Sequence, residues 1–175
     1  SGGYMLVLLN VALSYAAWFA VAVLAARGHF WLAVIPSLLA VAVHLGFASG
    51  ERRSAELKLS LAAVALGLGV ETIHMASGAT RYQPGASIEG LPPAFMLGLW
   101  PAFAMLINVS LAWLKDRMWV AVVLGALASG PSYFAGAKLG ALTLGEPVWQ
   151  SLAIIGAVWA IAFPALIAIA RRLDR

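Results

Sequence analysis

The sequence predicts an all-α integral membrane protein, a compact bundle of six transmembrane helices with both termini in the cytoplasm. Of its 175 residues, 63% are hydrophobic and 10% are charged, whereas a soluble domain carries charge at about a quarter of its positions. The mean hydropathy is +0.93. This composition excludes a secreted module, a nucleic-acid-binding domain and an ordinary cytosolic enzyme. The absence of cysteine excludes a disulfide framework, a thiolate nucleophile and an iron–sulfur cluster.

Six apolar segments follow one another along the chain, each close to the ~20 residues that a spanning helix needs. They cover approximately residues 4–26, 29–49, 57–77, 94–114, 118–144 and 148–170. The first segment is too long for the core of a signal peptide and follows no basic residue, so we expect it to be retained. Because the six segments use nearly all of the chain, we expect residues 1–175 to form a single transmembrane domain.

The distribution of lysine and arginine predicts how the bundle is oriented. If the N-terminus is inside, the outer loops hold Arg27 and Arg81. The inner loops and the C-terminal tail then hold Arg52, Arg53, Lys58, Lys115, Arg117, Arg171, Arg172 and Arg175. Cytoplasmic loops retain an excess of basic residues, so both termini are expected on that side. The net charge of +4 has the same explanation and indicates no acidic partner.

Residues 78–93 form the one long outer loop, and its three prolines and three glycines exclude a regular helix. The loop is either a passive connector or a lid that carries Arg81, Tyr82 and Glu89 over an outward-facing cavity. At the inner boundary, the mixed charges of residues 51–58 predict a solvated turn.

The segment 57–77 carries the most informative polar residues. At 100° per residue, one helical face holds Ser60, Val64, Gly67, Glu71, His74 and Gly78. Glu71 lies about 21 Å from the inner end of this segment, in the outer half of the bilayer. A carboxyl group at that depth is costly and needs an explanation. Glu71 could carry a proton, act as a general acid or base, or donate a hydrogen bond between helices.

Metal and haem sites are not expected. Glu71 and His74 have the spacing of half a di-iron site, but the complete site needs a second such motif and two more carboxylates. His44 and His74 are separated by about 15–20 Å along the bundle axis, too far to ligate one haem iron. We therefore predict no metal and no cofactor.

The segment 118–144 contains the sequence GPSYFAGAKLG, residues 130–140. Gly130 and Pro131 predict a break or kink near the middle of the membrane. Ser132, Gly136 and Gly140 form a stripe of small residues that, with Gly67 of the 57–77 segment, predicts close helix packing. Lys138 lies on the opposite face, where it either pairs with Glu71 or extends to the outer head groups. Tyr133 places a hydroxyl group near the expected kink.

The chain resembles the bacterial inner-membrane family catalogued as the domain of unknown function number two thousand eight hundred and seventy-eight. The resemblance rests on Asn10, His44, Gly67 followed four residues later by an acid, the run PAFMLGLWPAF with Trp100 and Phe103, and GPSYFAGAKLG. Glu71 stands where the family pattern has Asp, and Phe95 stands where it has Trp. The resemblance implies the bacterial cytoplasmic membrane and a genetic setting of acyl-chain-modifying enzymes. It implies no activity.

Four functions remain open from the sequence. The first is binding or handling of a lipid or other amphiphile at a polar site in the outer half, formed by Glu71, His74, Tyr133, Lys138 and Trp100. The second is proton-coupled transport of a small solute, with Glu71 carrying the proton. The third is an intramembrane enzyme that uses Glu71 and His74 for proton transfer. The fourth is a structural partner of a neighbouring membrane enzyme, or a homo-oligomer, in which the polar groups only specify packing. The partners expected are membrane lipids.

Overall fold

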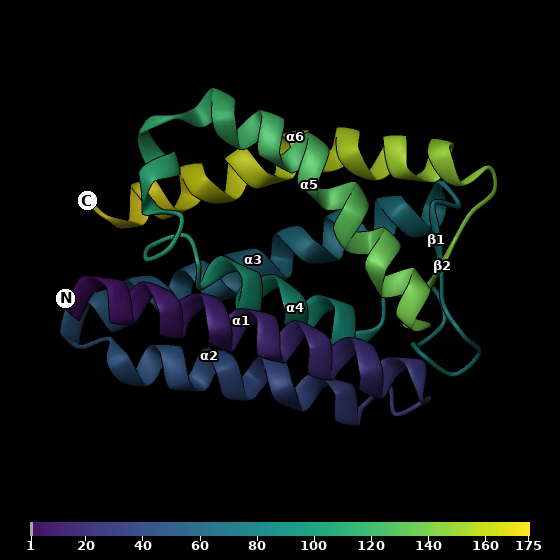
Figure 1. Cartoon of the computed structure of the whole chain (residues 1–175), viewed down its shortest axis with the longest axis horizontal. Coiled ribbons are helices and arrows are strands. Elements are labelled where there is room, and N and C mark those ends of the chain that lie inside the picture. The colour runs from purple at the N-terminus through teal and green to yellow at the C-terminus, as the bar shows by residue number, and fades with distance from the viewer. Residues whose placement is uncertain (1) are drawn as a thin grey trace.

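Figure 1 presents the computed structural model of the protein, which describes residues 2–175. It is all-α apart from one two-stranded sheet. The helices are α1 (Gly2–Ala26), α2 (Ile35–Phe47), α3 (Gly50–Ala76), α4 (Ala94–Ala104), α5 (Met118–Leu139) and α6 (Val148–Leu173). Two 3₁₀ segments, Leu32–Val34 and Ala112–Asp116, precede α2 and α5. The all-α class and the six helices agree with the prediction from the sequence.

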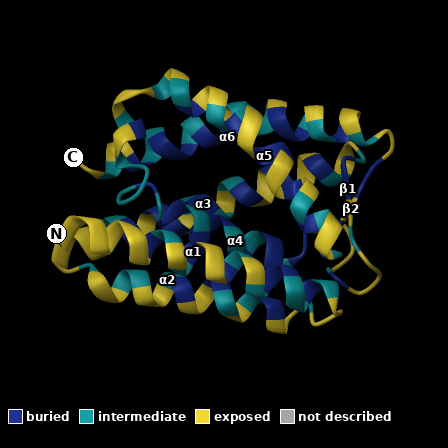
Figure 2. Ribbon diagram, in the orientation of Figure 1, coloured by how far each residue is buried: buried dark blue, intermediate teal, exposed yellow. Residues whose placement is uncertain are grey.

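Four of these helices are long and apolar enough to span a membrane, namely α1, α3, α5 and α6. The shortest of them, α5, has 22 residues, which at ~1.5 Å per residue is about 33 Å and matches the hydrocarbon core of a bilayer. Many large apolar side chains are exposed on the outside of the bundle (Figure 2). Length, hydropathy and this exposed apolar surface are those of a membrane protein.

The helices α2 and α4 are shorter than the expected segments 29–49 and 94–114. They have 13 and 11 residues. The backbone after α4 forms turns over residues 105–111 before the second 3₁₀ segment begins. The segment 94–114 is therefore a broken helix.

The helices are arranged as three pairs (Figure 1). The pair α3 and α4 lies between the pair α1 and α2 and the pair α5 and α6. In this arrangement α6, and not α5, packs along α3. Both termini lie at one end of the bundle, which we call the terminal end.

The opposite end, which we call the sheet end, carries a short antiparallel sheet (Figure 1). There β1 (Thr80–Arg81) pairs with β2 (Thr143–Leu144). The expected helix 118–144 therefore ends early, at Leu139. Gly140 stops it by adopting a left-handed conformation with φ of 97°, which glycine accepts without steric cost.

At Gly130 and Pro131 we expected a break or a kink. The helix α5 remains helical through both residues, so there is no break. In Figure 1 the first half of α5 lies beside α6 and the second half turns towards α1, so the proline bends the helix without interrupting it. The interruption lies after α4, at Ala104.

Side chains of α1 stabilise the end of α4. Asn10 Nδ2 donates a hydrogen bond to the carbonyl oxygen of Met105 over 3.0 Å, and Ser14 Oγ donates one to that of Ala102 over 3.0 Å. The last carbonyl groups of a helix lack partners within it, and inside a membrane water does not supply them. These two bonds explain how α4 ends among buried residues.

The close packing of α5 uses glycines other than the expected stripe. A Cβ atom at Gly125 would overlap the carbonyl oxygen of Trp159, and one at Gly156 would lie 2.8 Å from the carbonyl oxygen of Ala126. Gly136, by contrast, has only Leu142 nearby, at 3.7 Å. Gly140 packs against Ala26 at the end of the helix, and Ser132 is exposed. The α5–α6 contact therefore depends on Gly125 and Gly156.

We predict that Gly125→Ala lowers the free energy of unfolding by about 1–3 kcal/mol, because the new methyl group forces two helix backbones apart. Gly69→Ala in α3 is the matched control, since nothing lies within 4 Å of a Cβ at that helical glycine. Thermal unfolding in detergent should give a lower midpoint for Gly125→Ala and an unchanged or higher midpoint for Gly69→Ala. Equal midpoints for the two variants would contradict the packing described.

Candidate functional site

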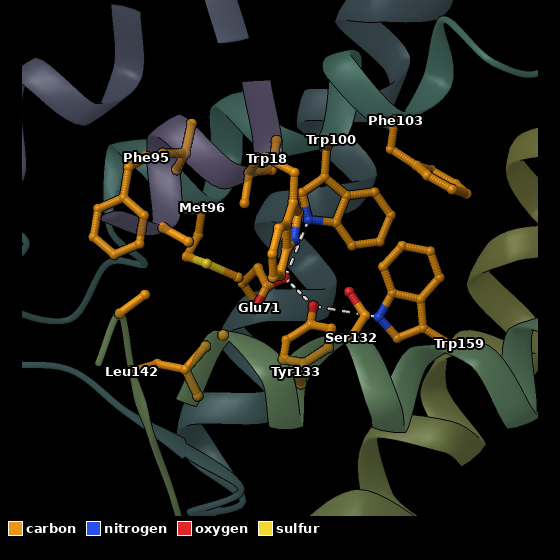
Figure 3. Close-up of a pocket in the computed structure, with 15 residues that line it drawn as sticks. Trp18, Glu71, Phe95, Met96, Trp100, Phe103, Ser132, Tyr133, Leu142 and Trp159 are labelled. Carbon is orange, nitrogen blue, oxygen red and sulfur yellow. Dashed lines mark hydrogen bonds between the residues drawn. The ribbon is translucent and has the colours of Figure 1, made fainter. Parts of the chain in front are cut away.

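A hydrogen-bonded cluster surrounds Glu71 in the half of α3 nearest the sheet end (Figure 3). The Glu71 side chain is fully buried, with 0% of its surface exposed. Trp100 of α4 donates its indole N–H to Oε1 over 3.2 Å, and the hydroxyl of Tyr133 in α5 donates to the same oxygen. His74, one turn further along α3, places Nδ1 3.3 Å from Oε2. The cluster joins three helices at one carboxyl group.

The direction of these hydrogen bonds is set by the chemistry of the donors. An indole N–H can only donate, so Trp159 Nε1 donates to the Tyr133 hydroxyl oxygen across 3.3 Å. Tyr133 is then left to donate its own hydrogen to Glu71. Oε1 therefore accepts two hydrogen bonds, and through Trp159 the network extends to α6.

His74 carries a buried polar atom without a partner. Its side chain is 0% exposed, and its ring packs edge-on against that of Tyr133 at 5.2 Å between centroids. Its Nδ1 faces Glu71, but among residues 2–175 nothing forms a hydrogen bond with Nε2. Buried polar groups without partners are uncommon. His74 thus keeps one ring nitrogen free for a further interaction.

Lys138 does not join this cluster. It is exposed, and its ammonium group lies 5.2 Å from the ring centroid of Phe134 on the outside of α5. Of the two alternatives for Lys138, the structure has the one in which it points away from Glu71. Within the described part of the chain, the only base at ion-pair distance from Glu71 is His74.

A cavity of about 120 Å³ lies beside the carboxyl group of Glu71. Its walls are mostly aromatic and aliphatic side chains, contributed by Trp18, Val21, Ala22, Phe95, Met96, Leu99, Trp100, Phe103, Ser132, Tyr133, Gly136, Ala141, Leu142 and Trp159. Ser132 lines the cavity and is also exposed, in the middle part of α5. The cavity therefore reaches the long side of the bundle.

The aromatic side chains of this wall support one another. The indole rings of Trp100 and Trp159 stack with 4.5 Å between centroids and 13° between planes. The ring of Phe103 packs edge-on against Trp159 at 5.5 Å. Figure 3 shows Glu71 with Trp100 on one side and Tyr133 on the other. The site thus combines one carboxyl group with a rigid aromatic wall.

The loop 78–93 covers the sheet end of the cavity wall. The ring of Tyr82 packs edge-on against Phe95 at 6.0 Å, and Ala86 is buried in the same apolar cluster. Burial, and to a smaller extent the charge of Glu71, raises the pKa of Tyr82 well above its usual value of 10, so this phenol stays neutral at physiological pH. Arg81 and Glu89 are exposed. The covering role considered for this loop therefore rests on Tyr82 and not on the charged residues.

A second polar cluster lies nearer the terminal end, and sequence reasoning missed it. Glu56 of α3 is only 3% exposed. It accepts hydrogen bonds from Asn108 Nδ2 over 2.7 Å and pairs with His44 Nε2 at 3.0 Å and Arg52 Nη2 at 3.3 Å. We predicted a solvated turn at residues 51–58, but α3 begins at Gly50 and turns Glu56 inwards. The isolated polar residues His44 and Asn108 were the available signal.

Asp174 extends this cluster to the end of α6. It bonds Arg52 Nη1 at 2.9 Å and Lys115 Nζ at 2.6 Å, and Lys115 also bonds Asn108. Partial burial alone would raise the pKa of Asp174, but these two cations hold it below the usual value. The cluster also borders a cavity of about 430 Å³, whose polar lining is Asn10, His44, Arg52, Glu56 and Asn108.

Comparison with known protein families identifies the family of this chain. The model described as "Protein of unknown function (DUF2878)" matches residues 7–165. The chain belongs to the DUF2878 family. Neither the comparison with curated proteins nor that with solved structures gave a match. The DUF2878 match confirms the resemblance seen in the sequence and includes Glu71, His74, Trp100 and Tyr133.

We predict that Glu56→Gln lowers the free energy of unfolding by about 2–3 kcal/mol, because an amide cannot replace a carboxylate that accepts bonds from charged donors. The matched control is Glu51→Gln, which changes an exposed acid in the first turn of α3. Thermal unfolding of both variants in the same detergent is the measurement. A loss of stability in Glu51→Gln as large as that in Glu56→Gln would be inconsistent with the cluster.

Proposed function

We propose that this protein binds and handles a lipid or other amphiphile inside the membrane, with Glu71 as the polar anchor. The observation that carries the proposal is a fully buried carboxyl group lining an apolar cavity that reaches the long side of the bundle. A ligand that enters from the side of a membrane protein comes from the bilayer. Such a ligand has an apolar portion that suits the aromatic wall and a polar portion that suits Glu71.

The proposal includes a placement in the membrane. All six helices would cross the bacterial cytoplasmic membrane, with α4 crossing as a broken helix completed by residues 105–116. Both termini would be cytoplasmic, which is supported by the eight basic residues that the inner loops and tail then hold. This orientation would place Glu71 in the outer half of the bundle and Glu56 near the cytoplasmic surface.

Each residue of the site has a distinct proposed role. Glu71 binds the polar part of the ligand, while Trp100 and Tyr133 hold its carboxyl group in one orientation. His74 contacts the other oxygen of Glu71 from outside the cavity lining. Binding and presentation of an acyl lipid would fit the setting of acyl-chain modification that the family resemblance implies.

Proton-coupled transport of a small solute is the second candidate. It is supported by the two buried carboxyl groups of α3, Glu71 and Glu56, each paired with a histidine and each beside a cavity. Such a transporter would show pH-dependent flux in proteoliposomes, abolished by Glu71→Gln. Amphiphile binding without any flux would favour the first candidate.

We predict that one lipid or amphiphile copurifies with the native protein in a stoichiometric amount and is lost from Glu71→Gln. The measurement is mass spectrometry of the organic extract of each purified protein. Glu89→Gln, which changes an exposed acid of the outer loop, is the matched control and should retain the ligand. The same bulk phospholipids in all three samples would overturn the proposal and leave helix packing as the role of Glu71.

A further inference from the structure

The carboxyl group of Glu71 is buried without a permanent positive partner. Its two closest donors, Trp100 and Tyr133, are neutral, and among residues 2–175 the only base at ion-pair distance is His74. Lys138 points away, as described above. An acidic group inside a membrane is stabilised most effectively by a cation, because water is absent and a neutral donor offsets only part of the charge.

The cavity beside this carboxyl group is rich in aromatic rings. Six of its lining side chains are aromatic, namely Trp18, Phe95, Trp100, Phe103, Tyr133 and Trp159. The face of an aromatic ring attracts a cation electrostatically, most strongly for tryptophan, and desolvation strengthens the attraction. Figure 3 shows these rings around the carboxyl group, with Trp159 beyond Tyr133. Acid and rings together form a surface that is complementary to positive charge.

We propose that the cavity selects cationic amphiphiles, whose amine or quaternary ammonium group lies beside Glu71 and against the aromatic wall. This inference rests on the proposed function and adds the charge of the ligand. The cavity volume of about 120 Å³ is small beside the ~300–1,000 Å³ that encloses a drug-sized ligand. It therefore holds a head group, while the apolar chain leaves past Ser132 towards the bilayer.

The composition of the site argues against the other classes of head group. A phosphate or carboxylate would lie beside the carboxyl group of Glu71 with no lysine or arginine at ion-pair distance among the described residues. An uncharged head group would make no cation–π contact with the rings. A cation satisfies Glu71 and uses the aromatic wall at the same time.

The experiment compares three single-chain amphiphiles of equal chain length: decyltrimethylammonium, decanol and decanoate. Each is titrated into the purified protein in a neutral detergent, and binding is followed by tryptophan fluorescence, since three tryptophans line the cavity. We expect saturable binding of decyltrimethylammonium, weakened about tenfold or more by Glu71→Gln, which removes the acidic group but keeps an acceptor for Trp100 and Tyr133. Glu89→Gln should bind as the native protein does.

A second variant keeps the test decisive if Glu71→Gln fails to fold. Glu71→Asp retains a carboxyl group and should still prefer the ammonium compound over decanol. Ammonium binding that is no tighter than decanol binding, or that is equal in the native protein and Glu71→Gln, would overturn the cation inference. If decanol or decanoate binds saturably and depends on Glu71, the proposed amphiphile site survives and only its charge preference fails. If none of the three compounds binds saturably, both proposals fail.

Discussion

The buried carboxyl group of Glu71 is the constraint on which this end of the bundle depends. A carboxyl group that is cut off from water must find its hydrogen-bond donors within the protein. Trp100 of α4 and Tyr133 of α5 supply them, and Trp159 of α6 in turn supplies Tyr133. Gly67 allows Trp100 to approach α3 closely, because a side chain at position 67 would overlap the indole ring of Trp100. Packing and polar chemistry are thus coupled at one turn of α3.

The same helix carries a second, separate polar cluster at Glu56. The two clusters differ in how their charge is balanced. Glu56 lies beside Arg52, and Asp174 links Arg52 to Lys115, so the charges near the terminal end are paired within the protein. Among the described residues, Glu71 has only His74 at ion-pair distance. We propose from this contrast that the Glu56 cluster stabilises the fold and that the Glu71 cluster stays available to a ligand.

Much of this arrangement could be predicted from the sequence, and the failures have physical causes. The sequence indicates a polar site at Glu71, Trp100 and Tyr133, because isolated polar groups in apolar helices are costly and need partners. Glu56 was missed because its charged neighbours Arg52 and Arg53 resemble a solvated turn. A break or kink was predicted at Pro131, where α5 bends, but the interruption after Ala104, where Asn10 and Ser14 satisfy the freed carbonyl groups, was not predicted. Such long-range hydrogen bonds leave no local pattern in the sequence.

A double-mutant cycle on Glu71 and Tyr133 tests the central claim most directly. Glu71→Met removes the acceptor at similar length, Tyr133→Phe removes the donor, and the free energy of unfolding is measured for each variant and for the pair. The account predicts a coupling energy of about 0.5–3 kcal/mol, so that the second change costs little once the first is made. Losses that add independently, to within about 0.5 kcal/mol, would show that the two side chains do not depend on each other, and would contradict the account.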